Sequence, residues 1–187
     1  MKWNIPNVLT TFRLILIPVF LLFYYLPVSW NHFAAAFVFW LAAITDYFDG
    51  YLARKLGQST PFGAFIDPVA DKLMVTCALV VLVEDFNAIW ITLPAIVIIG
   101  REVVISALRE WMAERNKRAT VAVSDVGKYK TAAQMLAIMG ILWQPNDMIV
   151  GVGAFLLYIA VVLTFWSMFT YLKAAKNELF AADNEAK

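Results

Sequence analysis

The sequence predicts an all-α, polytopic membrane protein with six transmembrane helices and a short N-terminal interfacial segment. Hydrophobic residues make up 62% of the 187-residue chain, whereas charged residues make up only 16%. The mean hydropathy is +0.71. This composition is typical of integral membrane proteins rather than of soluble domains. Lys and Arg are also distributed unevenly, which is the pattern that sets membrane orientation.

Six apolar segments follow one another, and several approach the roughly 20 residues that a helix needs to cross a bilayer. Residues 1–7 contain Trp3 and Pro6 in a mixed stretch suited to the membrane surface, and residues 173–187 form a charged surface tail. We therefore expect residues 1–187 to form a single membrane domain. The predicted spans are 8–26, 32–53, 68–84, 88–108, 130–143 and 148–172.

Three short breaks between these segments, 27–31, 84–87 and 144–147, contain none of the fifteen Lys and Arg residues. Basic residues concentrate in cytoplasmic connections, so both termini are expected on the cytoplasmic side of a bacterial inner membrane. Nothing in this charge pattern predicts a nucleic-acid partner. The single cysteine excludes an internal disulfide.

Four carboxylates flank the break between the second and third segments. Asp46 and Asp49 are three residues apart, and Asp67 and Asp71 are four apart, so each pair lies on one face of a helix. If the two helix ends lie together, the four charges need cations, and a hard divalent ion prefers oxygen ligands. A capping role is the structural alternative for Asp67, which precedes Pro68. Four carboxylates at these spacings favour a metal cluster.

These residues belong to a longer pattern, Asp46-x2-Asp49-Gly50-x2-Ala53-Arg54-x8-Gly63-x3-Asp67-x3-Asp71. The pattern resembles the signature of the CDP-alcohol phosphatidyltransferases at all eight positions. Similarity extends to residues 4–7, to Thr10 and Arg13, and to residues 101–102, 106–110 and 127–131. These stretches are similar to the branch of the family that makes phosphatidylglycerophosphate in bacteria.

The resemblance implies a metal-dependent, six-helix membrane enzyme, usually a homodimer, with its active site near the cytoplasmic surface. Such an enzyme displaces CMP from CDP-diacylglycerol with an alcohol, using two divalent cations, Mg²⁺ or Mn²⁺. By analogy, Asp46, Asp49 and Asp67 bind metal, while Asp71 is the general base and also contacts a metal. The expected CDP-diacylglycerol site consists of Asp46, Asp49, Gly50, Ala53, Arg54, Gly63 and Asp67.

The class of alcohol that accepts the phosphatidyl group is predicted from three cations that lie near or within apolar segments. These are Arg101, Arg109 and Lys130. A charge in such a position needs a partner, which Glu102 and Glu110 could partly supply. A basic pocket favours a phosphorylated alcohol, and we expect glycerol 3-phosphate. The alternatives are an inositol-phosphate acceptor, a cardiolipin-type activity or, from another class, a divalent-cation transporter. A transporter would place its carboxylates near the bilayer midplane and show an internal repeat.

Overall fold

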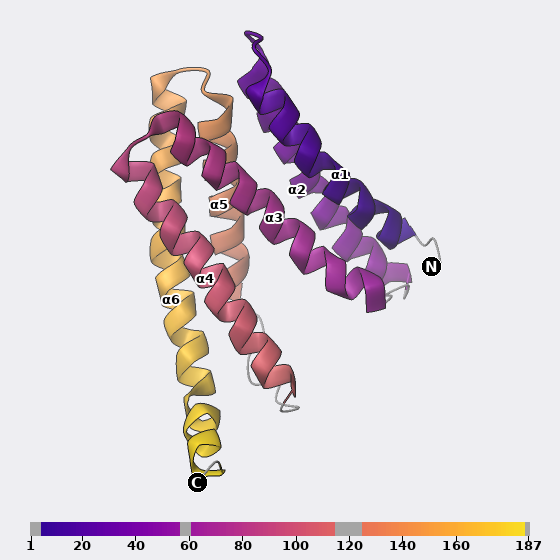
Figure 1. Ribbon diagram of the computed structural model, residues 1–187, viewed down its shortest axis with the longest axis vertical. Helices are drawn as coiled ribbons and strands as arrows, with labels where there is room; N and C mark the ends of the chain where they lie inside the picture. The colour runs from indigo at the N-terminus through magenta and orange to yellow at the C-terminus, as the bar shows by residue number, and fades with distance from the viewer. Residues whose placement is uncertain (1–4, 57–60, 115–124, 186–187) are drawn as a thin grey trace.

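The computed structural model describes residues 5–56, 61–114 and 125–185, and within these ranges its regular secondary structure is all α-helix, joined by short connections. Figure 1 shows long helices, with α1, α2 and the first part of α3 slanting away from α4, α5 and α6. The predicted all-α fold is confirmed for the described residues. The helices are α1 (Ile5–Tyr25), α2 (Asn31–Leu56), α3 (Pro61–Phe86), α4 (Ile89–Glu114), α5 (Asp125–Trp143) and α6 (Asp147–Glu185).

Three of the described helices are long and apolar enough to cross a membrane: α1 over Val8–Tyr25, α4 over Ile89–Glu114 and α6 over Asp147–Lys173. The other three helices carry charged residues within their apolar stretches, including Asp46 in α2, Asp71 in α3 and Lys130 in α5. These are the residues that the sequence singled out for function. A six-span count therefore stays a prediction, while a multi-pass membrane protein is supported.

The helix boundaries refine several expectations. The third helix begins at Pro61, seven residues before the apolar segment predicted from 68, and proline is well suited to a first helical position. Asp67 thus lies inside α3, so the alternative that it caps a helix N-terminus is wrong. At the other end of the chain, α6 continues without interruption from its apolar part to Glu185. Residues 5–7 are likewise continuous with α1.

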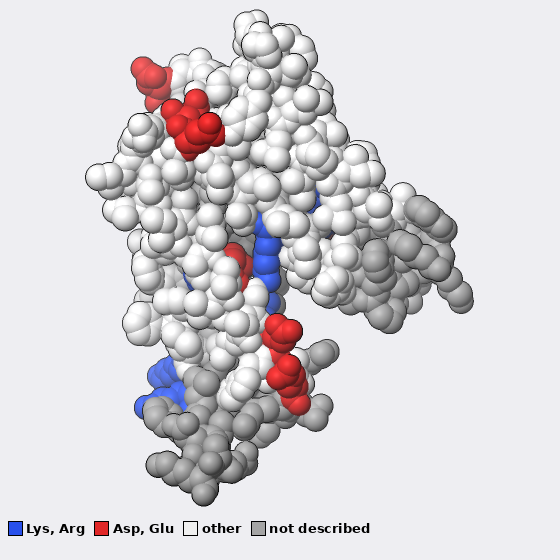
Figure 2. Space-filling view, in the orientation of Figure 1, with Lys and Arg blue, Asp and Glu red and all other residues white. Residues whose placement is uncertain are grey.

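The helices share a main apolar core, to which Phe20 of α1, Phe39 of α2, Leu82 of α3 and Ile138 of α5 contribute fully buried side chains. A smaller cluster lies between α4 and α6. Much of the remaining apolar surface is exposed, as expected for a surface that faces lipid rather than water. Figure 2 shows this largely uncharged surface, with Lys, Arg, Asp and Glu atoms visible in a recess near its middle.

Among the described helices, α5 and α6 pack against each other most extensively. A Cβ atom added to Gly153 would lie 2.7 Å from Ile141 Cγ1 and 3.1 Å from the Ala137 carbonyl oxygen. Only glycine permits this approach of α6 to α5, which is a common device in membrane helices. The close contact fixes where the N-terminal part of α6 lies relative to α5.

The three connections without Lys or Arg lie at one end of the molecule, and the opposite helix ends, including both chain termini, lie at the other (Figure 1). The segregation of basic residues in the sequence is therefore also a segregation in space. It brings the aspartate signature and the basic stretch of α4 to the same half of the bundle.

Candidate active site

Two polar contacts join α1 to the aspartate signature. Arg13 is almost fully buried, and its Nη1 lies 2.7 Å from Asp46 Oδ1. One turn earlier on α1, the hydroxyl of the buried Thr10 donates a hydrogen bond to Asp67 Oδ1. Since Asp46 belongs to α2 and Asp67 to α3, α1 holds the two halves of the signature through Arg13 and Thr10.

Asp71 lies between the signature and a second polar region. With Arg13 and Met135 it lines a small crevice beside α1, and it also lines a larger polar cavity. One carboxylate thus borders both the crevice beside Arg13, which is the partner of Asp46, and the larger cavity. This placement suits a group that acts on one substrate while another is bound nearby.

Part of the predicted signature lies outside the described residues or side chains: Asp49, Gly50, Ala53 and Arg54. Gly63 is described and is buried. Across the described residues, no three acidic, histidine or cysteine side chains lie close enough together to hold a metal ion. The four-carboxylate cluster includes Asp49 and so stays a prediction. The donors are all carboxylate oxygens, a set that fits Mg²⁺ or Mn²⁺.

The larger cavity has a volume of about 230 Å³. Arg101, Arg109 and Lys130, the cations selected from the sequence, all line it, although they come from α4 and α5. The structure therefore brings the three residues together. The lining consists of Pro68, Asp71, Lys72, Val75, Arg101, Glu102, Arg109, Lys130, Thr131, Gln134, Met135 and Tyr171.

Glu102 links two of the cations. Its Oε1 accepts a hydrogen bond from Arg101 Nη1 at 2.7 Å and another from Lys130 Nζ at 2.8 Å. Lys130 and Arg101 are only 4% and 9% exposed, so their charges need such a partner. One carboxylate offsets one of the two positive charges, and Arg109 adds a third. The described charges around Glu102 thus leave a net positive cavity wall, which suits an anionic ligand.

Lys72 extends this network toward α4. Its ammonium group donates a hydrogen bond to Ser106 Oγ, and Ser106 Oγ donates in turn to the Glu102 carbonyl oxygen at 2.5 Å. Lys72 follows Asp71 directly in α3. The contact therefore ties the helix that carries Asp71 to the helix that carries Arg101, and it fixes the relative position of the two walls.

The sequence did not predict that α6 contributes side chains to the basic cavity and its arginines. Tyr171, 5% exposed, accepts a hydrogen bond from Arg109 Nη2 at 2.8 Å. Its ring centroid lies 5.2 Å from Arg109 Cζ and 5.6 Å from Arg101 Cζ, both within cation–π range. Ser167 accepts a further bond from Arg101 Nη2 at 3.0 Å. A signal was present, because buried Thr164, Ser167 and Tyr171 follow helical spacing within an otherwise apolar segment.

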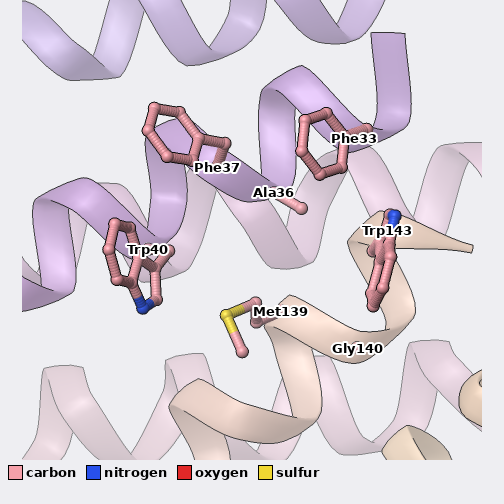
Figure 3. Close-up of a pocket in the computed structure, with 7 residues that line it drawn as sticks. All are labelled: Phe33, Ala36, Phe37, Trp40, Met139, Gly140 and Trp143. Carbon is pink, nitrogen blue, oxygen red and sulfur yellow. The ribbon is translucent and has the colours of Figure 1, made fainter. Parts of the chain in front are cut away.

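An apolar groove of about 290 Å³ between α2 and α5 is separate from this polar site. Figure 3 shows the aromatic side chains of α2 facing Met139 and Trp143 of α5 across the groove. Phe33 lies near the start of α2 and Trp143 ends α5, so the groove is nearer the end with the short, uncharged connections. Its lining contains no charged side chain.

Comparisons with known proteins agree with the signature. A family model described as CDP-alcohol phosphatidyltransferase matches residues 3–166. Curated proteins named CDP-diacylglycerol–glycerol-3-phosphate 3-phosphatidyltransferase are similar over nearly the whole chain. The protein from Sodalis glossinidius is 58% identical, covering 96% of this chain and 99% of its own length. Those from Shigella flexneri serotype 5b and Escherichia coli K12 are 57% and 56% identical, each covering 96% of this chain and 98% of their own length.

Proposed function

The chain belongs to the CDP-alcohol phosphatidyltransferase family, and from this premise we propose that it transfers the phosphatidyl group of CDP-diacylglycerol to sn-glycerol 3-phosphate. The products are phosphatidylglycerophosphate and CMP, which makes the reaction a step of phospholipid biosynthesis. One structural observation supports this choice of acceptor within the family. Asp71 of the signature lines the same cavity as Arg101, Arg109 and Lys130.

The two substrates occupy different parts of the site. CDP-diacylglycerol binds at the signature. The family resemblance assigns Asp46, Asp49 and Asp67 to its diphosphate, Arg54 to its phosphates, and Gly50, Ala53 and Gly63 to the space for the nucleotide. The acceptor binds in the basic cavity, where guanidinium and ammonium groups make charge-assisted hydrogen bonds to its phosphate. Asp71 lies in the lining of that cavity and of the crevice beside Arg13, and so between the two substrates.

The reaction requires an acceptor hydroxyl to become nucleophilic. The Asp71 carboxylate accepts the hydroxyl proton as the oxygen attacks the phosphorus of the phosphatidyl group. A new P–O bond forms to the glycerol oxygen, and the P–O bond to the CMP phosphate breaks. The cationic side chains of the cavity hold the acceptor phosphate and thereby orient the attacking oxygen. This supplies the proximity that a bimolecular reaction in solution lacks.

Two divalent cations, Mg²⁺ or Mn²⁺, are part of this proposal. Asp46, Asp49, Asp67 and Asp71 would hold them, and the metals would stabilise negative charge on the diphosphate and the leaving CMP. Arg13 is already paired with Asp46 and Thr10 with Asp67, so α1 orients two of these carboxylates before a metal arrives.

The proposed orientation places this site at the cytoplasmic face of a bacterial inner membrane. It is supported by the clustering of the basic residues at the end of the bundle that carries both termini. That face is also where a water-soluble glycerol phosphate would reach the cavity. A homodimer is proposed from the family resemblance.

The test uses purified protein in detergent with CDP-diacylglycerol and Mg²⁺, and it measures CMP release with a panel of acceptors. The panel contains glycerol 3-phosphate, glycerol, serine, an inositol phosphate and phosphatidylglycerol, with the lipid product identified by mass spectrometry. We expect rapid CMP release with glycerol 3-phosphate and little with glycerol, which has the same hydroxyls but no phosphate. Faster release with an inositol phosphate or phosphatidylglycerol would support one of the alternative acceptors instead.

A further inference from the structure

Gln134 has an unused hydrogen-bonding group inside the basic cavity. Its side chain lines the cavity from α5 and is only 5% exposed. Its amide oxygen has no hydrogen-bond partner among the residues that the structure describes. A buried carbonyl oxygen without a partner is rare in folded proteins, and a bound ligand can supply the missing donor. Gln134 belongs neither to the aspartate signature nor to the three cations, so it has no role in the site as described so far.

Gln134 and Lys130 both belong to α5, which defines their relative position. It follows Lys130 by four residues, so the two side chains project from the same helix face about one turn apart. Lys130 is fixed by its bond to Glu102 at 2.8 Å. An acceptor phosphate held by Lys130 would therefore place the rest of the molecule within reach of Gln134 or of Asp71, which lines the same cavity.

The chemistry of the acceptor has three parts. Its phosphate is an anion, its terminal hydroxyl attacks phosphorus, and its secondary hydroxyl takes no part in bond formation. The cations suit the phosphate, and Asp71 suits the attacking hydroxyl. The lining's other uncharged polar side chains are Thr131 and Tyr171, and the Tyr171 oxygen already accepts from Arg109. A neutral amide oxygen is a suitable acceptor for an alcohol O–H.

We propose that the Gln134 amide oxygen accepts a hydrogen bond from the secondary hydroxyl of the acceptor, which makes Gln134 a specificity-determining residue for a phosphorylated triol. This inference rests on the proposed function, because it assumes that glycerol 3-phosphate occupies the basic cavity. A site built to bond a hydroxyl discriminates against an analogue that lacks it, since the buried polar group is then left without its partner.

The test compares two acceptors that differ in one hydroxyl: glycerol 3-phosphate and 3-hydroxypropyl phosphate, which lacks the secondary hydroxyl. The measured quantity is the ratio of their kcat/KM values. We expect the wild-type protein to prefer glycerol 3-phosphate by roughly tenfold or more. Gln134→Leu should reduce this preference to less than about threefold, by lowering kcat/KM for glycerol 3-phosphate and leaving that for the analogue nearly unchanged.

Met135→Leu is the matched control, because Met135 lines the same cavity next to Gln134 and the exchange nearly conserves side-chain volume. It should keep the wild-type ratio. Gln134→Met provides a second variant if Gln134→Leu does not yield folded protein. A purely structural role for Gln134 would lower activity toward both acceptors equally and keep the ratio, and that result would overturn the inference.

The same measurements separate this inference from the proposed function. A wild-type protein that releases no CMP with glycerol 3-phosphate, although it does so with another acceptor, overturns the proposed function. A wild-type protein that uses glycerol 3-phosphate but does not distinguish it from 3-hydroxypropyl phosphate overturns only the assignment of Gln134.

Discussion

Replacement of Lys130 by methionine tests the basic cavity most directly. Methionine matches the lysine stem in length and packs well in apolar surroundings, so the exchange removes the ammonium group without opening a large cavity. Lys130 Nζ lies 2.8 Å from Glu102 Oε1, and the same oxygen also accepts from Arg101 Nη1 at 2.7 Å. Glu102 therefore keeps one cationic partner in the Lys130→Met protein, and no carboxylate is left alone in the cavity wall.

The expected effect on folding is small and the effect on acceptor binding is large. Removing one partner of a buried ion pair is strongly destabilising when the other charge is left alone, and this is avoided here because Glu102 keeps its bond to Arg101. A charge-assisted hydrogen bond to a phosphate is worth about 1.5–3 kcal/mol. At 1.4 kcal/mol per factor of ten, its loss raises KM for glycerol 3-phosphate roughly tenfold to one hundredfold. Less of the negative charge of Glu102 is then offset, so this carboxylate repels the acceptor phosphate more strongly and also raises KM for glycerol 3-phosphate.

The assay is steady-state CMP release with one substrate varied while the other is saturating. KM for CDP-diacylglycerol should stay within about twofold of wild type, because that substrate binds at the aspartate signature. Lys173→Met is the matched control: it removes the same charge from an exposed position on α6 outside the cavity lining. This control should leave both Michaelis constants unchanged.

Two results would refute the reasoning. In one, Lys130→Met keeps the wild-type KM for glycerol 3-phosphate, which would mean that the ammonium group does not contact the phosphate. In the other, Lys173→Met and Lys130→Met raise this constant equally, which would assign the effect to overall charge. The cations of the cavity would then serve membrane orientation only.

Three further predictions concern other parts of the site. Asp67→Ala should abolish turnover and weaken Mn²⁺ binding in a protein that still elutes as wild type on size exclusion; full activity in excess EDTA would contradict the metal assignment. Asp71→Asn should lower kcat by about 10²–10⁴, the usual contribution of a general base, while CDP-diacylglycerol still binds; a variant with a third of wild-type turnover would exclude that role. Tyr171→Phe loses the oxygen that accepts from Arg109 but keeps the ring, so KM for glycerol 3-phosphate should rise about threefold. Phe169→Leu, an exposed exchange on the same helix, should leave it unchanged, and equal effects of the two would contradict a positioning role for Tyr171.

Local spacing made the aspartate residues predictable. Asp46 and Asp49, or Asp67 and Asp71, are neighbours on a helix surface whatever the rest of the chain does, because a helix places residues three or four apart on one face. The same geometry puts Arg101 and Arg109, which are eight residues apart, on one side of α4, and both contact the Tyr171 ring. What spacing could not provide was the identity of the residues that face these side chains from other helices.

The sequence by itself determined the helical class, the membrane character, the aspartate signature and the cations near the membrane surface, because each depends on composition or on spacing within one helix. Only the tertiary structure decided that Glu102 joins Arg101 to Lys130, that Gln134 and Asp71 line one cavity, and that Tyr171 of α6 contacts two arginines of α4. Arg109 and Tyr171 are 62 residues apart in the chain. Their contact depends on how α4 and α6 pack, and helix packing is set by side-chain shape over the whole interface rather than by a periodic pattern in either helix.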